Sequence, residues 1–195
     1  MAPLNPFPPV HPDAWSAHQQ VLADYSGTVG DLITQFASFT GRAVNQVPFP
    51  GSWTAGQVAE HLEKSNIMIT RALVLPGQPA HRDPAARIAE LRESFLDLRV
   101  KFKSPDFILP IRGTYDHETM ARQLRLSAEA LLEAAREVRP DELIQVPAFG
   151  EISRLEILHF VLYHTRRHLH QLRNILAHLP PGEPGGKTDS NSPDA

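Results

Sequence analysis

Apolar side chains recur at spacings of three and four residues in several stretches of the chain, which is the pattern of amphipathic helices. Long stretches of this kind predict four helices, over about residues 13–39, 54–75, 117–138 and 153–179. Two of them carry a clear start signal, because Thr54 with Gln57 and Ser153 with Glu156 have the spacing of a capping box. The pattern therefore predicts a chain dominated by long helices.

A weaker apolar stripe lies between the second and third long helices. It predicts one extra, shorter helix that begins at Asp83 and Pro84 and reaches Phe102. Residues 103–116 contain two prolines and a glycine, which indicate an irregular connection. No convincing alternation of apolar and polar residues suggests a β-strand, so the expected fold class is all-α.

Four amphipathic helices bury their apolar stripes most simply as a four-helix bundle, here expected as one domain over residues 13–179. Because the connection between the second and third helices is long, these helices need not be antiparallel neighbours. Up-down-down-up winding is then at least as favoured as simple up-and-down winding. We expect the proline-rich residues 1–12 to form an extended arm and the polar residues 180–195 to form a disordered tail.

The overall composition narrows the class of protein. Of 195 residues, 42% are hydrophobic and 21% are charged, which is ordinary for a soluble globular chain. The formal net charge of −3 gives no reason to expect nucleic acid as a partner. No segment approaches the length of about 18 apolar residues that spans a membrane, and the N-terminus lacks a secretion signal, so we expect a cytoplasmic protein.

The chain has no cysteine and ten histidines. Disulfides, thiolate metal ligands and a cysteine nucleophile from this chain are thereby excluded. Imidazole is the remaining soft metal ligand. The positions of the histidines therefore matter most for chemistry.

His164 and His168 are four residues apart, so on a helix they lie on one face and can reach a common ion. Gln171 lies on the same face one turn further on, whereas His170 points elsewhere. The simpler alternative, that these two histidines bind no metal, stays open, because such a pair arises readily by chance among ten histidines. Basic side chains are also favoured in the C-terminal half of a helix by the helix dipole.

A third ligand must come from another helix. His61 is the best candidate because its apolar neighbours place it on the buried side of the second helix. His159 and His178 are competitors. A lone histidine of this kind is more often a core residue than a ligand, so the residues alone leave the third ligand open.

Three segments, taken together, resemble one known family. GSWTAGQVAEHL (51–62), in which Trp53 lies eight residues before His61, is similar to the tryptophan-then-histidine signature of the DinB-like (damage-inducible) family of metal-binding four-helix bundles. Residues 147–175 resemble the final helix of that family, with two histidines four apart followed by a glutamine. KFKSPDFILP (101–110) is similar to a loop of one branch of the family.

This resemblance implies a divalent metal ion held by His61, His164 and His168. It also implies an up-down-down-up bundle and frequent homodimers. Some members are thiol S-transferases that use a low-molecular-weight thiol, others are described as metal-dependent hydrolases, and many have no established activity. Zinc or nickel is the expected ion, with iron or copper as alternatives, because imidazole discriminates poorly among these metals.

Three neutral imidazoles leave an ion with its full charge and an open position, as in catalytic sites. The leading expectation is therefore a metal-dependent enzyme that activates a thiol or water, as a small-molecule S-transferase or hydrolase. The alternative is a non-catalytic dimer whose metal binds a small ligand or fastens two helices.

Two further polar side chains of the last helix are candidate site residues. Gln171 is expected to support or orient a ligand, and Arg167 either holds an anionic group or is an ordinary solvated arginine. No carboxylate is placed clearly as a general base, and Glu60, Asp116 and Glu118 are only possibilities.

Overall fold

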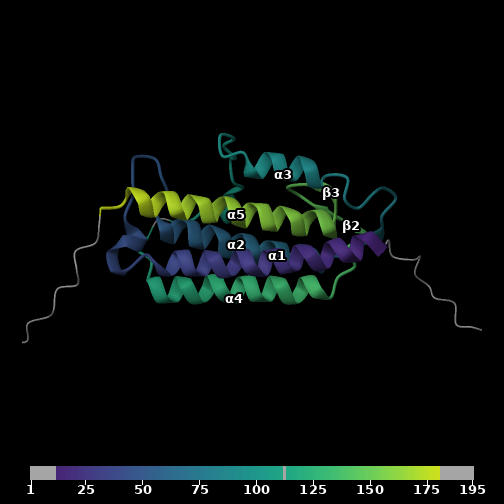
Figure 1. The fold of residues 1–195 in the computed structure, drawn as a ribbon, viewed down its shortest axis with the longest axis horizontal. Coiled ribbons are helices and arrows are strands. Elements are labelled where there is room, and N and C mark those ends of the chain that lie inside the picture. The colour runs from purple at the N-terminus through teal and green to yellow at the C-terminus, as the bar shows by residue number, and fades with distance from the viewer. Residues whose placement is uncertain (1–11, 112, 181–195) are drawn as a thin grey trace, which may run out of the picture.

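The computed structural model describes residues 12–111 and 113–180 (Figure 1). Its helices are α1 (Pro12–Ala37), α2 (Ala55–Leu73), α3 (Ile88–Leu96), α4 (His117–Arg136) and α5 (Arg154–His178). Shorter elements are the 3-10 turns η1 (Gly41–Asn45) and η2 (Asp106–Ile108) and the strands β1 (Gln78–Pro79), β2 (Glu142–Val146) and β3 (Gly150–Ser153). Apart from Pro12 and Pro180, the expected arm and tail lie outside the described residues.

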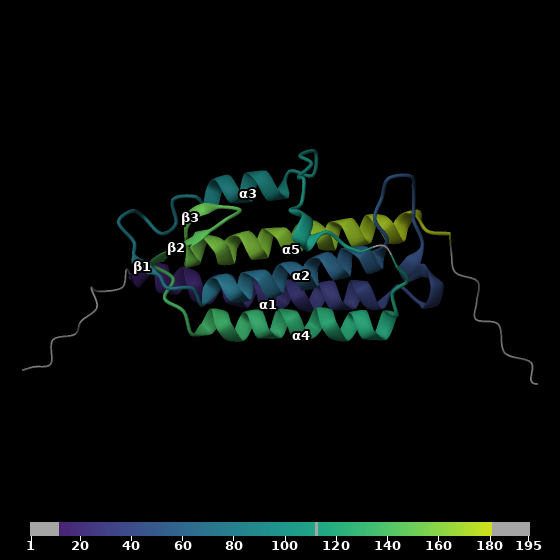
Figure 2. The same cartoon turned by 180° about the vertical axis from the view of Figure 1, so that it is seen from behind.

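The four long helices lie side by side (Figures 1 and 2). Both α1 and α2 pack against α4 and α5, and α3 lies on the outer side of α5. Followed along the colour gradient of Figure 1, α1 and α5 run in one direction and α2 and α4 run in the other. The predicted all-α class and the extra helix between the second and third long helices are confirmed, and the winding agrees with up-down-down-up.

Capping boxes fix the beginnings of α2 and α5, as the sequence predicts. The amide of Gln57 donates to Thr54 Oγ1 (3.2 Å), and the amide of Thr54 donates to Gln57 Oε1 (2.9 Å). The same reciprocal pair joins Ser153 and Glu156, at 3.0 and 2.9 Å. These bonds satisfy amides that a helix start otherwise leaves without partners. They also fix the register of the two helices that carry the candidate metal ligands.

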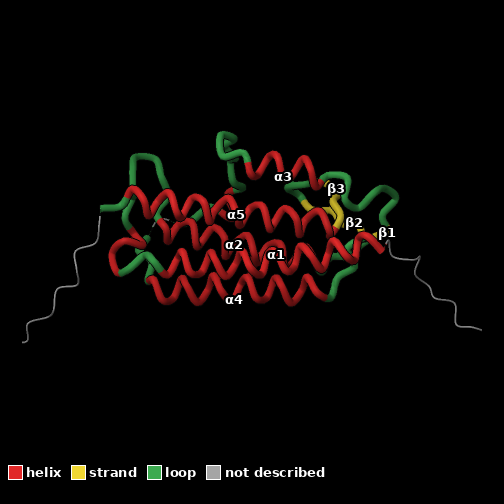
Figure 3. The backbone as a smooth tube through the Cα atoms, viewed as in Figure 1, coloured by secondary structure: helices red, strands yellow, loops and turns green. Residues whose placement is uncertain are grey.

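A small antiparallel sheet corrects the expectation that the chain has no strands. The order is β1-β2-β3, and the sheet lies at the end of the bundle where α5 begins (Figure 3). Alternation fails as a signal here because adjacent residues of β2, Leu143 and Ile144, are both buried. β1 has only two residues, and one is Pro79, which is tolerated at a sheet edge.

The extra helix is shorter than predicted at both ends. Asp83 does not begin it: its side chain accepts the amide of Ala85 (2.8 Å) and its carbonyl accepts the amide of Ala86 (3.2 Å), which makes a turn before Ile88. Phe102 lies beyond the end of α3, yet its ring stacks on Phe95 with centroids 4.6 Å apart. The apolar stripe therefore marks a packed face that continues past the helix.

Two apolar clusters fill the bundle, one towards each end. Between them lies a polar layer to which three helices contribute: Tyr25 of α1 donates to Asn66 of α2 (3.4 Å), which donates to Ser127 of α4 (3.1 Å). Buried hydrogen-bonded groups of this kind favour one arrangement of helices over others, because a shifted register would leave them unpaired. The candidate metal ligands lie at this level of the bundle.

Candidate metal centre

The structure brings the three predicted histidines together. His61 lies in the second turn of α2, and His164 and His168 lie in the middle of α5, which runs antiparallel to α2. All three side chains are buried, with exposures of 2%, 9% and 7%. Within the described residues they form the group of ligand-type side chains able to share an ion, and no carboxylate belongs to it.

The nitrogen atoms have the spacing of a coordination site. His164 Nε2 lies 3.1 Å from His61 Nε2 and 3.1 Å from His168 Nε2, and the three ligand atoms are all within 4.8 Å of one another. Imidazole nitrogens at about 2.0–2.1 Å from one ion are about 2.8–3.4 Å apart for coordination angles between a right angle and the tetrahedral angle. The two separations that involve His164 Nε2 therefore fit ligands of one divalent ion, and the three atoms are close enough to form a candidate site.

The outer nitrogens of two imidazoles fix the direction of their lone pairs. His61 Nδ1 donates to the carbonyl oxygen of Ile108 (3.0 Å), and His168 Nδ1 donates to Gln171 Oε1 (2.8 Å). Both Nε2 atoms therefore carry lone pairs that point at His164 Nε2. That atom has at most one proton to donate, so it cannot satisfy both lone pairs. A cation placed between them satisfies all three nitrogens.

Burial keeps the cluster in its ligating form. Desolvation lowers the pKa of His61 and lowers that of His164 well below its usual range, with further lowering of the His164 pKa by His168 and His61. Burial also lowers the pKa of His168 to about 3. All three imidazoles are therefore neutral near pH 7, which is the state that binds a metal.

Aromatic rings surround the cluster. Trp53 lies against His61 (ring centroids 5.2 Å apart), and Phe160 stacks on His164 at 5.2 Å with an interplanar angle of 25°. Phe95 of α3 packs against Phe160 (4.9 Å) and approaches His164 edge-on, at 6.2 Å. These walls keep competing polar groups away and lower the local dielectric, which strengthens any charge interaction at the site.

Gln171 and Arg167, the other predicted site residues, have different surroundings. Gln171 holds His168, as described above. The Arg167 guanidinium donates to the backbone carbonyls of Phe95 (3.3 Å), Asp97 (3.0 Å) and Val100. These contacts fasten the connection between α3 and α4, and binding of an anionic group by Arg167 stays a prediction.

The competing histidines lie in other contacts. His159 Nδ1 is paired with the hydroxyl of Tyr163 (3.3 Å), and His178 Nδ1 donates to the carbonyl of Asn174 (2.8 Å). His170 is exposed, as expected. Geometry thus selects His61 as the third member of the cluster, which the residue spacing alone left open.

None of the three candidate general bases lies free beside the cluster. Asp116 caps α4 by accepting the amide of Thr119 (2.9 Å), and Glu118 is exposed. Burial opposes ionisation of Glu60, but hydrogen bonds from Lys64, the Tyr115 hydroxyl and a backbone amide outweigh it and lower its pKa. Glu60 is therefore an ionised, fully engaged carboxylate and is poorly suited to take up a proton.

Sequence reasoning missed the contribution of residues 97–111, here called the strap. It connects α3 towards α4 and supplies the carbonyl oxygen of Ile108 that holds His61. A backbone carbonyl has no signature in side-chain identity. The nearest signal was the proline-containing KFKSPDFILP stretch, which marks an irregular connection without indicating what it touches.

Comparisons with known proteins give a family match whose span includes the candidate ligands. The sequence model described as "DinB superfamily" matches residues 28–172, which include all three histidines. A Bacillus subtilis (strain 168) protein, the "Uncharacterized protein YuaE", is 27% identical over 139 residues, covering 68% of this chain and 82% of the relative. No solved structure gives a significant match. Within residues 12–111 and 113–180, no helix combines the length and apolar character needed to cross a membrane.

Proposed function

Since the chain belongs to the DinB superfamily, we propose that it is a metal-dependent enzyme in which His61, His164 and His168 hold one divalent ion. The observation that carries this proposal is the convergence of two lone pairs, oriented by Ile108 and Gln171, on the Nε2 atom of His164. Zinc or nickel is the proposed ion, with iron or copper as alternatives, because an all-imidazole set accommodates each of them.

The proposed reaction is transfer of a small thiol or hydrolysis of a small molecule. A divalent ion held by three neutral ligands lowers the pKa of a water or thiol that reaches it, and so supplies a nucleophile near neutral pH. The chain's own residues keep the imidazoles neutral, orient them and exclude bulk water with the rings of Trp53 and Phe160. A low-molecular-weight thiol is the proposed co-substrate, since the chain has no cysteine of its own.

A second candidate function is a non-catalytic metal protein, in which the ion fastens α2 to α5 or holds a small ligand. It is favoured by one observation: each carboxylate considered as a base is engaged elsewhere or exposed. A reaction that needs a general base would have to obtain it from the substrate or from solvent.

A homodimer is also proposed. The strap carries six of the exposed large apolar side chains: Leu98, Val100, Phe102, Phe107, Leu109 and Ile111. An apolar surface of this kind is typical of an interface. Light scattering of the full chain tests it, with a mass of two chains expected.

Cobalt substitution separates the enzyme from the non-catalytic alternative. Tag-free protein loaded with Co²⁺ should change its visible spectrum when a small thiol is added, because the thiol takes the open position. His164→Ala should abolish the cobalt spectrum while the helical circular dichroism is largely retained. The matched control is His170→Ala, an exposed histidine of the same helix, which should leave the spectrum unchanged.

A purely structural ion gives the opposite pattern. The thiol would then leave the cobalt spectrum unchanged, and His164→Ala would remove the cooperative thermal transition together with the metal.

A further inference from the structure

The strap (residues 97–111) passes over the metal centre and is held at both ends. From α3 it descends to the level of α5 and α2, where η2 contacts α2 (Figure 2). Arg167 of α5 holds its first part through the backbone carbonyls of Asp97 and Val100, and it also holds the carbonyl of Phe95 at the end of α3. Side chains of α2 hold its last part. The two attachments differ in whether they can affect the orientation of the histidine side chains.

The attachment on α2 is a connected set of polar contacts. Lys64 Nζ donates to the carbonyl of Leu109 (2.8 Å) and pairs with Glu60 Oε1 (2.8 Å). Glu60 Oε2 accepts the amide of Ile111 (2.9 Å) and the hydroxyl of Tyr115 (2.6 Å). Glu60, Lys64 and Tyr115, here called the clasp, therefore grip the backbone immediately after Ile108.

The carbonyl oxygen of Ile108 lies between the clasp and the metal ligands. It accepts the Nδ1 proton of His61 at 3.0 Å, which leaves the Nε2 lone pair of that imidazole facing His164. A histidine without this partner is free to change its tautomer or turn its ring, and both changes weaken metal binding. Because Ile108 contributes a backbone atom, its position depends on the clasp.

We propose that Glu60, Lys64 and Tyr115 are positioning residues of the metal centre. They hold the strap so that Ile108 fixes His61 in its ligating form, and an ion bound by the histidines in turn holds the strap in place. This inference rests on the proposed metal binding. Reciprocity is a thermodynamic requirement: if the closed strap raises metal affinity by a given factor, the metal stabilises the closed strap by the same factor.

Arg167 makes a useful contrast. Its hydrogen bonds go to the carbonyls of Phe95, at the end of α3, and of Asp97 and Val100 in the strap, all of which precede Ile108 by eight or more positions. The effect on His61 is therefore assigned to the clasp on α2 and not to the attachment of the strap in general.

Two variants test the clasp, each by removing one polar group with little change of shape. Lys64→Met removes the donor to Leu109, and Tyr115→Phe removes the hydroxyl that contacts Glu60. Lys64→Arg is the conservative rescue, because it keeps a cationic donor. The matched control is Arg71→Met, which removes the same charge from an exposed position of α2.

Two readouts are needed on the full-length chain. Co²⁺ affinity is measured by competition with a chelator, together with the cobalt absorption spectrum. Opening of the strap is measured as the rate of tryptic cleavage after Lys101 and Lys103, two exposed strap residues, with and without Co²⁺. We expect Co²⁺ to slow this cleavage in the unaltered protein. Lys64→Met and Tyr115→Phe should each weaken Co²⁺ binding about tenfold, the loss typical of removing a partner of a ligating histidine.

The measured Co²⁺ affinities and cleavage rates either support or overturn the proposal. Weaker binding and faster cleavage in both clasp variants, with Lys64→Arg and Arg71→Met close to the unaltered protein, support the proposal. Faster cleavage with unchanged Co²⁺ affinity overturns it, since the clasp is then only a loop anchor, and unchanged values of both overturn it as well. Absence of Co²⁺ binding by the unaltered protein refutes the proposed function itself, and the inference falls with it.

Discussion

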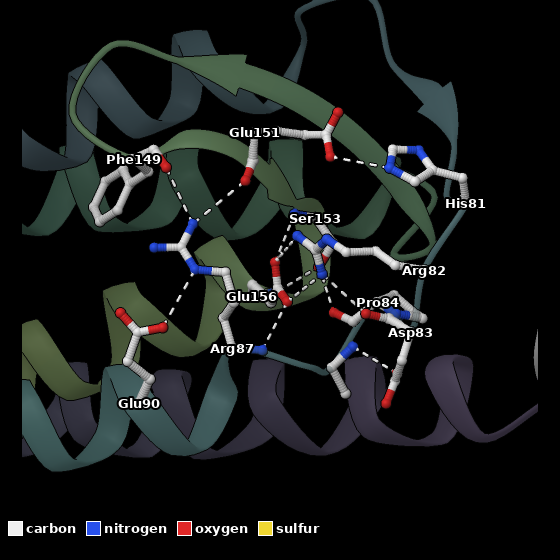
Figure 4. A network of polar contacts seen from close by, with 11 residues as sticks. His81, Arg82, Asp83, Pro84, Arg87, Glu90, Phe149, Glu151, Ser153 and Glu156 are labelled. Carbon is white, nitrogen blue, oxygen red and sulfur yellow. Dashed lines mark hydrogen bonds and ion pairs between the residues drawn. The ribbon is translucent and has the colours of Figure 1, made fainter.

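Two buried polar clusters lie on the same helix, α5, and they differ in how their charges and lone pairs are satisfied. At the start of the helix, Glu156 is fully buried, and its carboxylate accepts two bonds from Arg82 (2.7 Å each) and the amides of Arg87 and Ser153 (2.9 Å each; Figure 4). Two to three turns later, the histidine cluster has lone pairs that converge on one another. The first cluster is satisfied by groups of this chain, whereas the second has the geometry of a group that could hold an ion.

The pKa values express the same contrast. Burial alone would raise the pKa of Glu156, but the hydrogen bonds from Arg82 and from the amides of Ser153 and Arg87 outweigh it and lower the pKa. Around His164 and His168 burial is the largest cause, and the hydrogen bond between His168 and Gln171 does not outweigh it, so their pKa values fall. A buried group that the chain stabilises in its charged form indicates an anchor of the fold. Buried bases that the chain keeps neutral and aims at one point indicate a ligand site.

The network around Glu156 also ties distant segments to the start of α5. Arg87 donates to the carbonyls of Phe149 (3.0 Å) and Glu151 (3.3 Å), so the outer edge of β3 is covered by a side chain (Figure 4). Arg82 belongs to the connection between α2 and α3. The loops before α3 and the β2–β3 hairpin are thus held against the helix that carries two of the histidines.

The largest loss of stability is expected from disrupting the polar cluster around Glu156. Glu156→Ala leaves the guanidinium of Arg82 and two backbone amides without their acceptor, and should lower the free energy of unfolding by about 3–5 kcal/mol. Urea denaturation measures this loss. Glu151→Ala is the control, because its ion pair with His81 is exposed and should contribute less than about 1 kcal/mol. A loss of similar size in both variants would contradict the account.

Acidification should lower the stability of the metal-free protein through the histidine cluster. In metal-free protein the unfolded chain takes up protons below pH 6.5, whereas His168, with a pKa of about 3, does not while the protein is folded. The stability that is present above pH 6.5 is therefore lost as the pH falls, by about 2 kcal/mol from this residue alone between pH 7 and pH 5.

Urea denaturation at several pH values in the presence of a chelator checks this expectation. A variant with all three histidines replaced should lose stability less steeply with acid. Identical pH profiles for the two proteins would show that the cluster is not kept neutral by burial.

A smaller effect is expected at Gly56, where α2 meets Tyr115 of the clasp. A Cβ at Gly56 would lie 2.5–2.9 Å from carbons of the Tyr115 side chain, so Gly56→Ala must displace that ring, at a loss of about 1–3 kcal/mol. Thermal denaturation measures the loss. Gly30→Ala in α1 is the matched control: nothing lies within 4 Å of its added carbon, and it should gain up to about 1 kcal/mol. A gain at both positions would refute the close packing of Tyr115.

The smallest effect is expected from His164→Leu in metal-free protein. Leucine fills similar volume and removes a buried base, so the free energy of unfolding should change by less than about 1 kcal/mol. The contrast with Glu156→Ala then separates a ligand site from an anchor of the fold. A loss of about 3 kcal/mol or more would mean that the histidine cluster is itself structural, and urea denaturation with a chelator present distinguishes the two results.

Sequence reasoning recovered the features that depend on the spacing of side chains along a helix. Helix starts followed from Thr54 and Ser153, and the pairing of His164 with His168 followed from helical spacing. The third ligand needed either the resemblance or the fold, because His61 meets the others only when α2 packs on α5. The strands were missed because β2 buries adjacent residues, and Ile108 was missed because a carbonyl acts without regard to its side chain.

The assignments of Arg167 and Glu60 show that spacing along the sequence does not predict which distant groups a side chain contacts. Sequence spacing placed Arg167 at the edge of the ligand face and Glu60 beside His61, which made both candidates for chemistry. Both side chains also hydrogen-bond backbone atoms of the strap, more than forty positions away in the chain: Glu60 accepts the amide of Ile111 and Arg167 donates to the carbonyl of Asp97. Such long-range contacts depend on the path of an irregular segment, which no local pattern encodes.

Metal stoichiometry with ligand identification tests the central claim most directly. Tag-free protein equilibrated with Zn²⁺ and freed of excess ion should hold one ion per chain, and X-ray absorption at the zinc edge should show imidazole nitrogens at about 2.0–2.1 Å. Binding should be lost in His61→Ala, His164→Ala and His168→Ala and retained in His170→Ala. A folded protein that binds no ion, or four variants that bind it equally well, would contradict the account.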